Sequence, residues 1–191
     1  MRWLTLYARS RQAPASLAAV LISAVTVWAL TSGAGEGSAD PRLPVLVLAT
    51  GAMAASIGLS GQDADLDRTA AIRWAPRRAA HVLLAAAIVG VVLLTVQTLG
   101  EDMASAAFIV RDSAGLMGLA ALGAAVAGGQ YAWTLPFAWL AFSFFAPPAT
   151  SAPMQVATWM LLPPGTAVGT WTALALGAAG TAAYAVVGPR R

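Results

Sequence analysis

The charged side chains that could do chemistry gather in one short segment, residues 62–78. It contains Asp63, Asp65, Asp67, Arg68, Arg73, Arg77 and Arg78. Alternating aspartates could hold a divalent cation such as Mg²⁺. On a helix, however, residues two apart point in different directions, and the glycine and distal acidic residue of a calcium loop are missing. A Mg²⁺-dependent membrane transferase would need a second acidic cluster, which the tract after Asp112 lacks.

Missing residue types exclude several other reactions. All eleven basic residues are Arg, so a Walker A loop and a lysine Schiff base are ruled out. The absence of Cys removes thiolate metal sites and thiol nucleophiles. His81 is the only histidine, and no partners for a catalytic triad or a metal site accompany it at helical spacing. We therefore expect a protein that is not an enzyme, with no catalytic, cofactor-binding or metal-binding residues.

The composition indicates an integral membrane protein. Hydrophobic residues make up 59% of the chain, charged residues 10%, and the mean hydropathy is +0.72. The 77 residues between Asp112 and Arg190 carry no formal charge, which a bilayer requires and a soluble surface would not tolerate. We interpret the net charge of +3 as a signal for orientation in the membrane. The chain has no basic face that could bind a polyanion, so nucleic acid is not expected as a partner.

The apolar tracts predict an all-α bundle of six transmembrane helices in a single domain. The expected spans are residues 13–33, 43–61, 79–99, 105–128, 132–147 and 166–187. Nine of the eleven Arg residues fall on one side if both termini are cytoplasmic, which predicts that orientation. Residues 1–11 have an apolar and a basic face and are expected to lie along the membrane interface.

Residues 62–78 are expected to form a short cytoplasmic helix followed by basic residues at the membrane surface. Asp63 can cap its N-terminus, and Pro76 should stop it near residue 75. Leu66, Ala70 and Trp74 recur at helical spacing and form one apolar stripe, which could face lipid or a partner protein. The same charges could equally serve only to set topology and to begin a helix.

Residues 148–165 are too short and too rich in proline to cross a membrane, yet too apolar for a free loop. We expect a short helix or hairpin in the outer leaflet, with Trp159 at the interface.

Arg111 and Asp112 form a charged pair near the outer edge of the fourth span. Charges at this depth are costly unless they are paired or hydrated. In the simpler interpretation Arg111 snorkels outward and Asp112 caps the helix that follows. If the helix begins earlier, the pair would instead face the bundle interior as a conformational latch.

Glycines predict close helix approach in two spans. Gly115, Gly118 and Gly123 give the fourth span a small-residue surface, and Gly177 and Gly180 do the same for the last span. In such an alanine-rich chain this pattern alone is weak.

Taken together, the arrangement resembles the membrane subunit of a type-2 ABC exporter, in a short actinobacterial form. The features that carry the resemblance are the six spans, the charged helix between spans two and three, and the proline-broken hairpin before the last span. The matching local segments begin at Asp67-Arg68-Thr69, at Arg77-Arg78 and at Arg111-Asp112.

The resemblance implies a coupling helix that docks on a separate ATP-binding cassette ATPase. Its residues would be Asp63, Leu66, Asp67, Arg68, Ala70, Arg73 and Trp74. It also implies a second permease copy or a homologous permease, contact with membrane lipids, and a bacterial plasma membrane. The cargo would be an amphipathic or lipophilic small molecule. Two alternatives stay open: a small enzyme acting on lipid or isoprenoid substrates with Mg²⁺ on the aspartates, or a scaffold subunit of a membrane complex.

Overall fold

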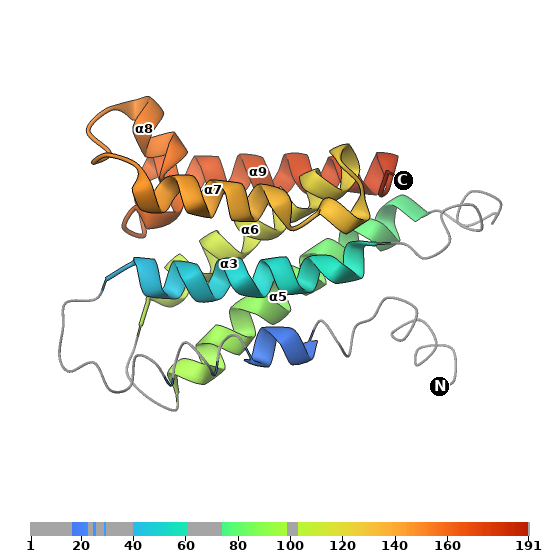
Figure 1. Ribbon diagram of the computed structural model, residues 1–191, viewed down its shortest axis with the longest axis horizontal. Helices are drawn as coiled ribbons and strands as arrows, with labels where there is room; N and C mark the ends of the chain where they lie inside the picture. The colour runs from blue at the N-terminus through green and yellow to red at the C-terminus, as the bar shows by residue number, and fades with distance from the viewer. Residues whose placement is uncertain are drawn as a thin grey trace.

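The part of the chain that the structure describes is folded into helices and contains no β-strand. The computed structural model describes residues 17–22, 25, 29, 40–60, 74–98 and 103–190 (Figure 1). Its main helices are α3 (Arg42–Ser56), α5 (Trp74–Gln97), α6 (Ala106–Val126), α7 (Thr134–Phe145), α8 (Ala152–Ala157) and α9 (Ala167–Val187). Short 3-10 turns follow α3, α6 and α8, at η1 (Ile57–Leu59), η2 (Gly129–Tyr131) and η3 (Trp159–Leu161).

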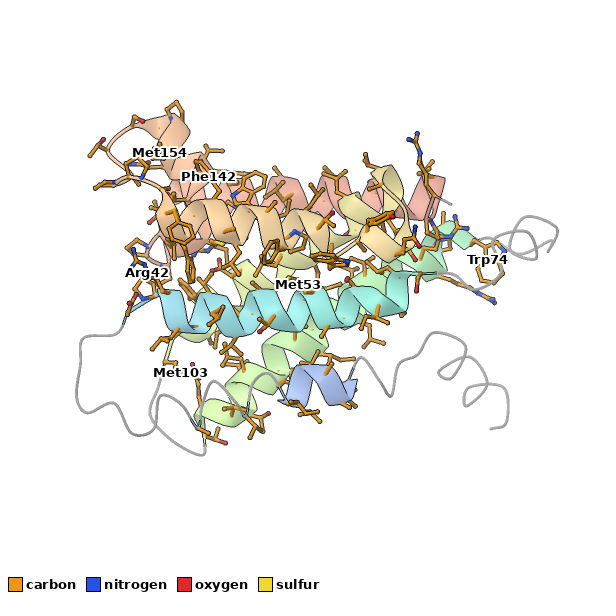
Figure 2. The ribbon with its side chains drawn as sticks, viewed as in Figure 1. Arg42, Met53, Trp74, Met103, Phe142 and Met154 are labelled. Carbon is orange, nitrogen blue, oxygen red and sulfur yellow. The ribbon has the colours of Figure 1, made fainter. Side chains whose placement is uncertain are left out.

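Helices α3, α5, α6, α7 and α9 run alternately in opposite directions between two ends of the molecule (Figure 1). Arg42, Met103 and Met154 lie at one end, here called the Arg42 end, and Trp74 lies at the other, the Trp74 end (Figure 2). The Trp74 end is tied together across the chain. The Tyr184 hydroxyl donates to the carbonyl of Leu59 over 2.9 Å, and the backbone N–H of Arg190 donates to the carbonyl of Ala124 over 3.2 Å.

Helix α6 is the centre of the bundle and contacts α3, α5, α7 and α9. Most of its residues are buried, including Ile109, Leu116 and Met117, so it presents no lipid-facing stripe along most of its length. The large exposed apolar side chains lie instead on the surrounding helices, such as Leu83 on α5 and Trp171 on α9. Such a surface suits hydrocarbon rather than water.

Four helices are long and apolar enough to cross a membrane, which indicates a membrane protein. They are Arg42–Leu59, Trp74–Gln97, Ala106–Val126 and Ala167–Val187. Helix α7 has 12 residues, so its length of about 18 Å falls short of a bilayer core of about 30 Å. Most of the expected first span lies outside the described residues. Six spans with cytoplasmic termini therefore remain a prediction.

Local chemistry explains where the central helices begin. The Ser105 hydroxyl accepts a hydrogen bond from the backbone N–H of Phe108 over 3.3 Å and thereby caps α6. Pro136 lies in the first turn of α7, where its missing N–H would have no partner within the helix. It therefore does not interrupt the helix.

Close packing of α6 on α9 depends on glycine, as the small-residue pattern predicts. A Cβ atom added to Gly118 would lie 2.5 Å from the Cα atom of Gly177. One added to Gly180 would lie 2.6 Å from the carbonyl carbon of Gly118. Both distances are too short for any side chain, so the two backbones are in direct contact. The small-residue surfaces expected on the fourth and the last span therefore pack against each other, a pairing that the sequence did not predict.

Gln97 joins the end of α5 to the start of the next helix. Its side-chain oxygen accepts from the backbone N–H of Ala104 over 2.9 Å, and its amide nitrogen donates to the Ala104 carbonyl over 3.1 Å. Gln97 is buried and Ala104 is half-buried, so both backbone groups depend on this side chain.

We expect Gln97→Leu to lower the free energy of unfolding by about 2 kcal/mol, because it leaves both groups of Ala104 without a partner. Gln97→Glu places a carboxylate oxygen against the Ala104 carbonyl in a buried position, so it should also be less stable than the parent chain. Denaturant titration in mild detergent measures both. Equal stability of Gln97→Leu and the parent chain would show that Gln97 does not hold this connection.

Candidate functional site

The charged pair Arg111 and Asp112 is buried inside the bundle, close to the Arg42 end. Because α6 begins at Ala106 with Ser105 as its cap, both residues lie in the second turn of the helix. Their side chains are 6% and 0% exposed. Asp112 therefore does not cap a helix, and Arg111 does not snorkel outward; that interpretation of the sequence is wrong. The early helix start turns the pair into the bundle.

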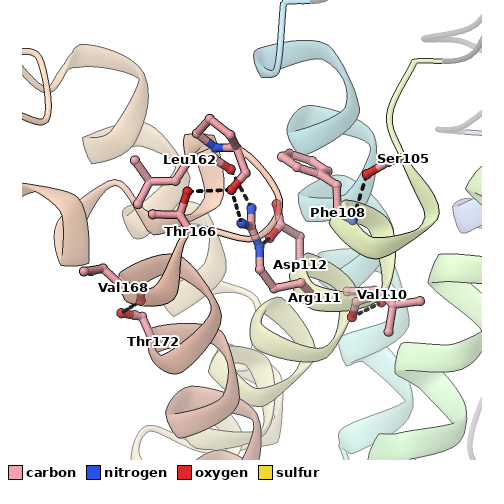
Figure 3. Close-up of polar contacts among 11 residues, drawn as sticks. Ser105, Phe108, Val110, Arg111, Asp112, Leu162, Thr166, Val168 and Thr172 are labelled. Carbon is pink, nitrogen blue, oxygen red and sulfur yellow. Dashed lines mark hydrogen bonds and ion pairs between the residues drawn. The ribbon is translucent and has the colours of Figure 1, made fainter.

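Arg111 connects α6 to the segment between η3 and α9 (Figure 3). Its Nε donates to Asp112 Oδ1 over 2.7 Å. One terminal nitrogen donates to the carbonyl of Pro163 over 3.1 Å and the other to the carbonyl of Leu162 over 2.9 Å. The planar guanidinium thus places a separate N–H on each of three acceptors, which a lysine ammonium cannot do in this geometry.

Apolar groups and a glycine complete the surroundings of this guanidinium. Its Cζ atom lies 5.0 Å from the centre of the Phe108 ring, one turn earlier on the same helix. On α9, a Cβ atom added to Gly169 would lie 3.2 Å from a terminal nitrogen of Arg111 and 3.3 Å from the carbonyl oxygen of Trp159. Gly169 therefore gives the guanidinium room to reach the two carbonyls.

Asp112 is satisfied on one side only. Oδ1 accepts from Arg111, whereas Oδ2 is buried and has no hydrogen-bond partner among the described residues. Buried carboxylate oxygens normally have partners, because removing one from water without replacement is costly. The packing of apolar side chains alone therefore does not explain why this buried pair is present.

Trp159 occupies the space beside this pair, and the sequence did not predict that position. Expected at the membrane interface, its side chain is fully buried instead, and its ring lies against Gly115 of α6. A Cβ atom on residue 115 would approach the ring to about 3.0 Å at Cζ3 and closer still at Cη2, so only glycine fits. The nitrogen of its ring is also buried without a partner among the described residues.

The chemistry that this site shows is hydrogen bonding between segments of the chain. The described residues contain no group of three or more His, Cys, Asp or Glu side chains that could hold a metal ion. The arrangement can hold the segment before α9 against α6. Its hydrogen bonds come from one guanidinium, so they form together or break together. Arg111 is the residue through which α6 does so.

The expected coupling residues lie mostly outside the described part of the chain. Asp63, Leu66, Asp67, Arg68, Ala70 and Arg73 are in that position. Trp74 is the first residue of α5, which continues through Pro76 in its first turn. The Arg77 guanidinium lies over the Trp74 ring, with 5.8 Å between Cζ and the ring centre. Trp74 and the basic residues after it thus stand together at one end of the bundle.

Comparison with protein-family models, with curated proteins and with solved structures finds no match for this chain.

Proposed function

We propose that the chain is the permease subunit of an ATP-binding cassette exporter in a bacterial plasma membrane. Six spans with cytoplasmic termini form the pathway together with a second permease copy or a homologous permease. A separate ATPase supplies the energy, because a chain without Lys has no Walker site of its own. The cargo is an amphipathic or lipophilic small molecule.

One observation carries the proposal: the elements that flank the charged connection and the segment between α7 and α9 lie at opposite ends of the bundle. The connection from η1 to α5, which contains the charged residues, leaves from and returns to the Trp74 end. The segment between α7 and α9 folds back at the Arg42 end (Figure 1). A transporter driven from the cytoplasm needs a docking element on one side and a moving element on the other.

The described charges favour the Trp74 end as the cytoplasmic one. Arg77 and Arg78 follow Trp74 at the start of α5, and Arg190 follows α9 and donates to Ala124 at that end. Each described Arg near the Arg42 end instead has an acidic residue within two positions in sequence. Arg111 is paired with Asp112, and Arg42 follows Asp40, whose carboxylate accepts from the Arg42 backbone N–H over 2.9 Å. An excess of Arg in cytoplasmic connections is the usual orientation signal.

Copurification from native membranes tests the proposal. The tagged chain should bring down an ATP-binding cassette protein, and Leu66→Asp combined with Trp74→Asp should reduce its recovery at least tenfold. Phe145→Asp, a highly exposed position at the other end of the bundle, should leave recovery unchanged.

Two results would count against the proposal. Unchanged recovery with the doubly substituted chain, when that chain elutes as the parent does, would reject the coupling residues. A stable homomer with magnesium-dependent activity on lipid, lost on Asp→Asn changes at residues 63, 65 and 67, would replace the transporter by an enzyme.

A further inference from the structure

Residues 146–165, here called the cover, form a separate layer over the Arg42 end of the bundle (Figure 1). None of the residues of α8 within it is buried. By contrast, Trp159 and Met160 of η3 are completely buried. The cover is therefore fixed through its second half, while its first half lies on the surface.

Few polar contacts attach the cover to the spans. From α7, Trp139 Nε1 donates to the carbonyl of Ala157 over 2.7 Å, and the Ser143 hydroxyl donates to the same carbonyl over 3.3 Å. From α6, Arg111 donates to the carbonyls of Leu162 and Pro163. Arg111 is the only one of these donors that holds two carbonyls of the cover and an internal carboxylate at once.

Both ends of the cover have the backbone character of hinges. At its start, Ala146 is extended and is followed by two prolines, which cannot continue α7. At its end, Gly165 has φ +88°, and no atom would lie within 4 Å of an added Cβ. Packing thus does not require glycine at this position, whereas its positive φ favours glycine.

Closing the cover keeps polar groups away from water. Asp112 Oδ2 and Trp159 Nε1 are both buried, and neither has a hydrogen-bond partner in the described part of the chain. Lifting the cover would let water reach both atoms, so opening recovers hydration that the closed form lacks. The hydration recovered on opening offsets part of the free energy that is lost when Trp159 leaves its apolar contacts.

We propose that the cover is a gate that opens as a unit at the Arg42 end, and that Arg111 is its latch. Opening releases the carbonyls of Leu162 and Pro163, withdraws Trp159 from Gly115, and exposes the buried face of α6. This goes beyond the permease assignment, because the gate belongs to this chain alone and its test needs no ATPase.

The natural absence of Cys makes the gate measurable by thiol labelling. Ser143→Cys places a thiol at a position 2% exposed, beside Ala157 of the cover. Ser113→Cys is the matched control, 4% exposed but facing Gly90 of α5. Ser151→Cys is exposed and reports that the reagent is active. Each purified chain is treated with a membrane-impermeant maleimide in mild detergent.

With Arg111 intact, Ser143→Cys should label at least tenfold faster than Ser113→Cys, since the gate opens without unfolding the bundle. Adding Arg111→Gln or Arg111→Lys should raise the Ser143→Cys rate at least tenfold more than it raises the Ser113→Cys rate, which follows the overall stability of the bundle. Equal rates at positions 143 and 113 in the parent background would overturn the gate. A position 143 rate that does not respond to either Arg111 variant, or that rises only in parallel with position 113, would overturn the latch.

Discussion

Arg111→Met should lower the free energy of unfolding by about 3–5 kcal/mol, the range observed when one partner of a buried ion pair is removed. The substitution leaves Asp112 buried and without the ion pair that Arg111 supplies. It also removes the donor to the carbonyl of Leu162, whereas Pro163 keeps the Thr166 hydroxyl, which donates to it over 2.8 Å. Denaturant titration in mild detergent measures the loss.

A double substitution separates the charge from the hydrogen bonds. Arg111→Met combined with Asp112→Leu removes the uncompensated carboxylate, so it should be more stable than Arg111→Met alone. It should stay less stable than the parent chain, because the Leu162 carbonyl still lacks its donor. A double variant no more stable than the single one would show that Asp112 is not the source of the loss.

The sequence singled out this pair but could not place it. Charged residues near the edge of an apolar span are unusual, so the sequence identifies them even though it does not show which way their side chains face. Their direction depends on where the helix begins, and Ser105 is a capping residue within a run of small residues that looks unremarkable in sequence. A start about two turns later would have made Asp112 the cap. The burial of the pair inside the bundle thus depends on the Ser105 cap, which is a weak signal in the sequence.

Trp159 illustrates a different limit. Tryptophan prefers membrane interfaces, so its local sequence predicts an interfacial position. Its actual position depends on Gly115, far away in the sequence, which leaves room for the ring on α6. The sequence predicted both residues as notable, Gly115 as part of a small-residue surface and Trp159 as an aromatic anchor. Only the tertiary arrangement shows that one accommodates the other.

The glycines of α6 and α9 were easier to interpret, because close approach of two helices requires small residues on both. Gly118 and Gly180 are in register across the interface. The pattern does not say which helices pair, however, and Gly123 of the same surface faces the backbone of Ala132, in the turn before α7. The sequence predicted which regions form helices and which helix faces carry small residues. It did not predict which of these faces pack against each other.

Gly180→Val is expected to destabilise the bundle by about 3 kcal/mol or more, at the upper end of overpacking effects. A Cβ atom at residue 180 would meet the carbonyl group of Gly118, and backbone cannot move aside as a flexible side chain can. Helices α6 and α9 would have to separate along their length. In a membrane, such tight packing is a principal source of helix association. The thermal midpoint in mild detergent should fall accordingly.

The neighbouring residue supplies the control. Ala179 is exposed on α9, so Ala179→Val adds a branched side chain to the same turn without touching α6. Its stability should stay within about 0.5 kcal/mol of the parent, as for most surface substitutions. Helix propensity is therefore not the reason for a loss confined to Gly180→Val. Equal losses at both positions would mean that valine weakens α9 itself, and the contact between the two backbones would no longer explain the glycines.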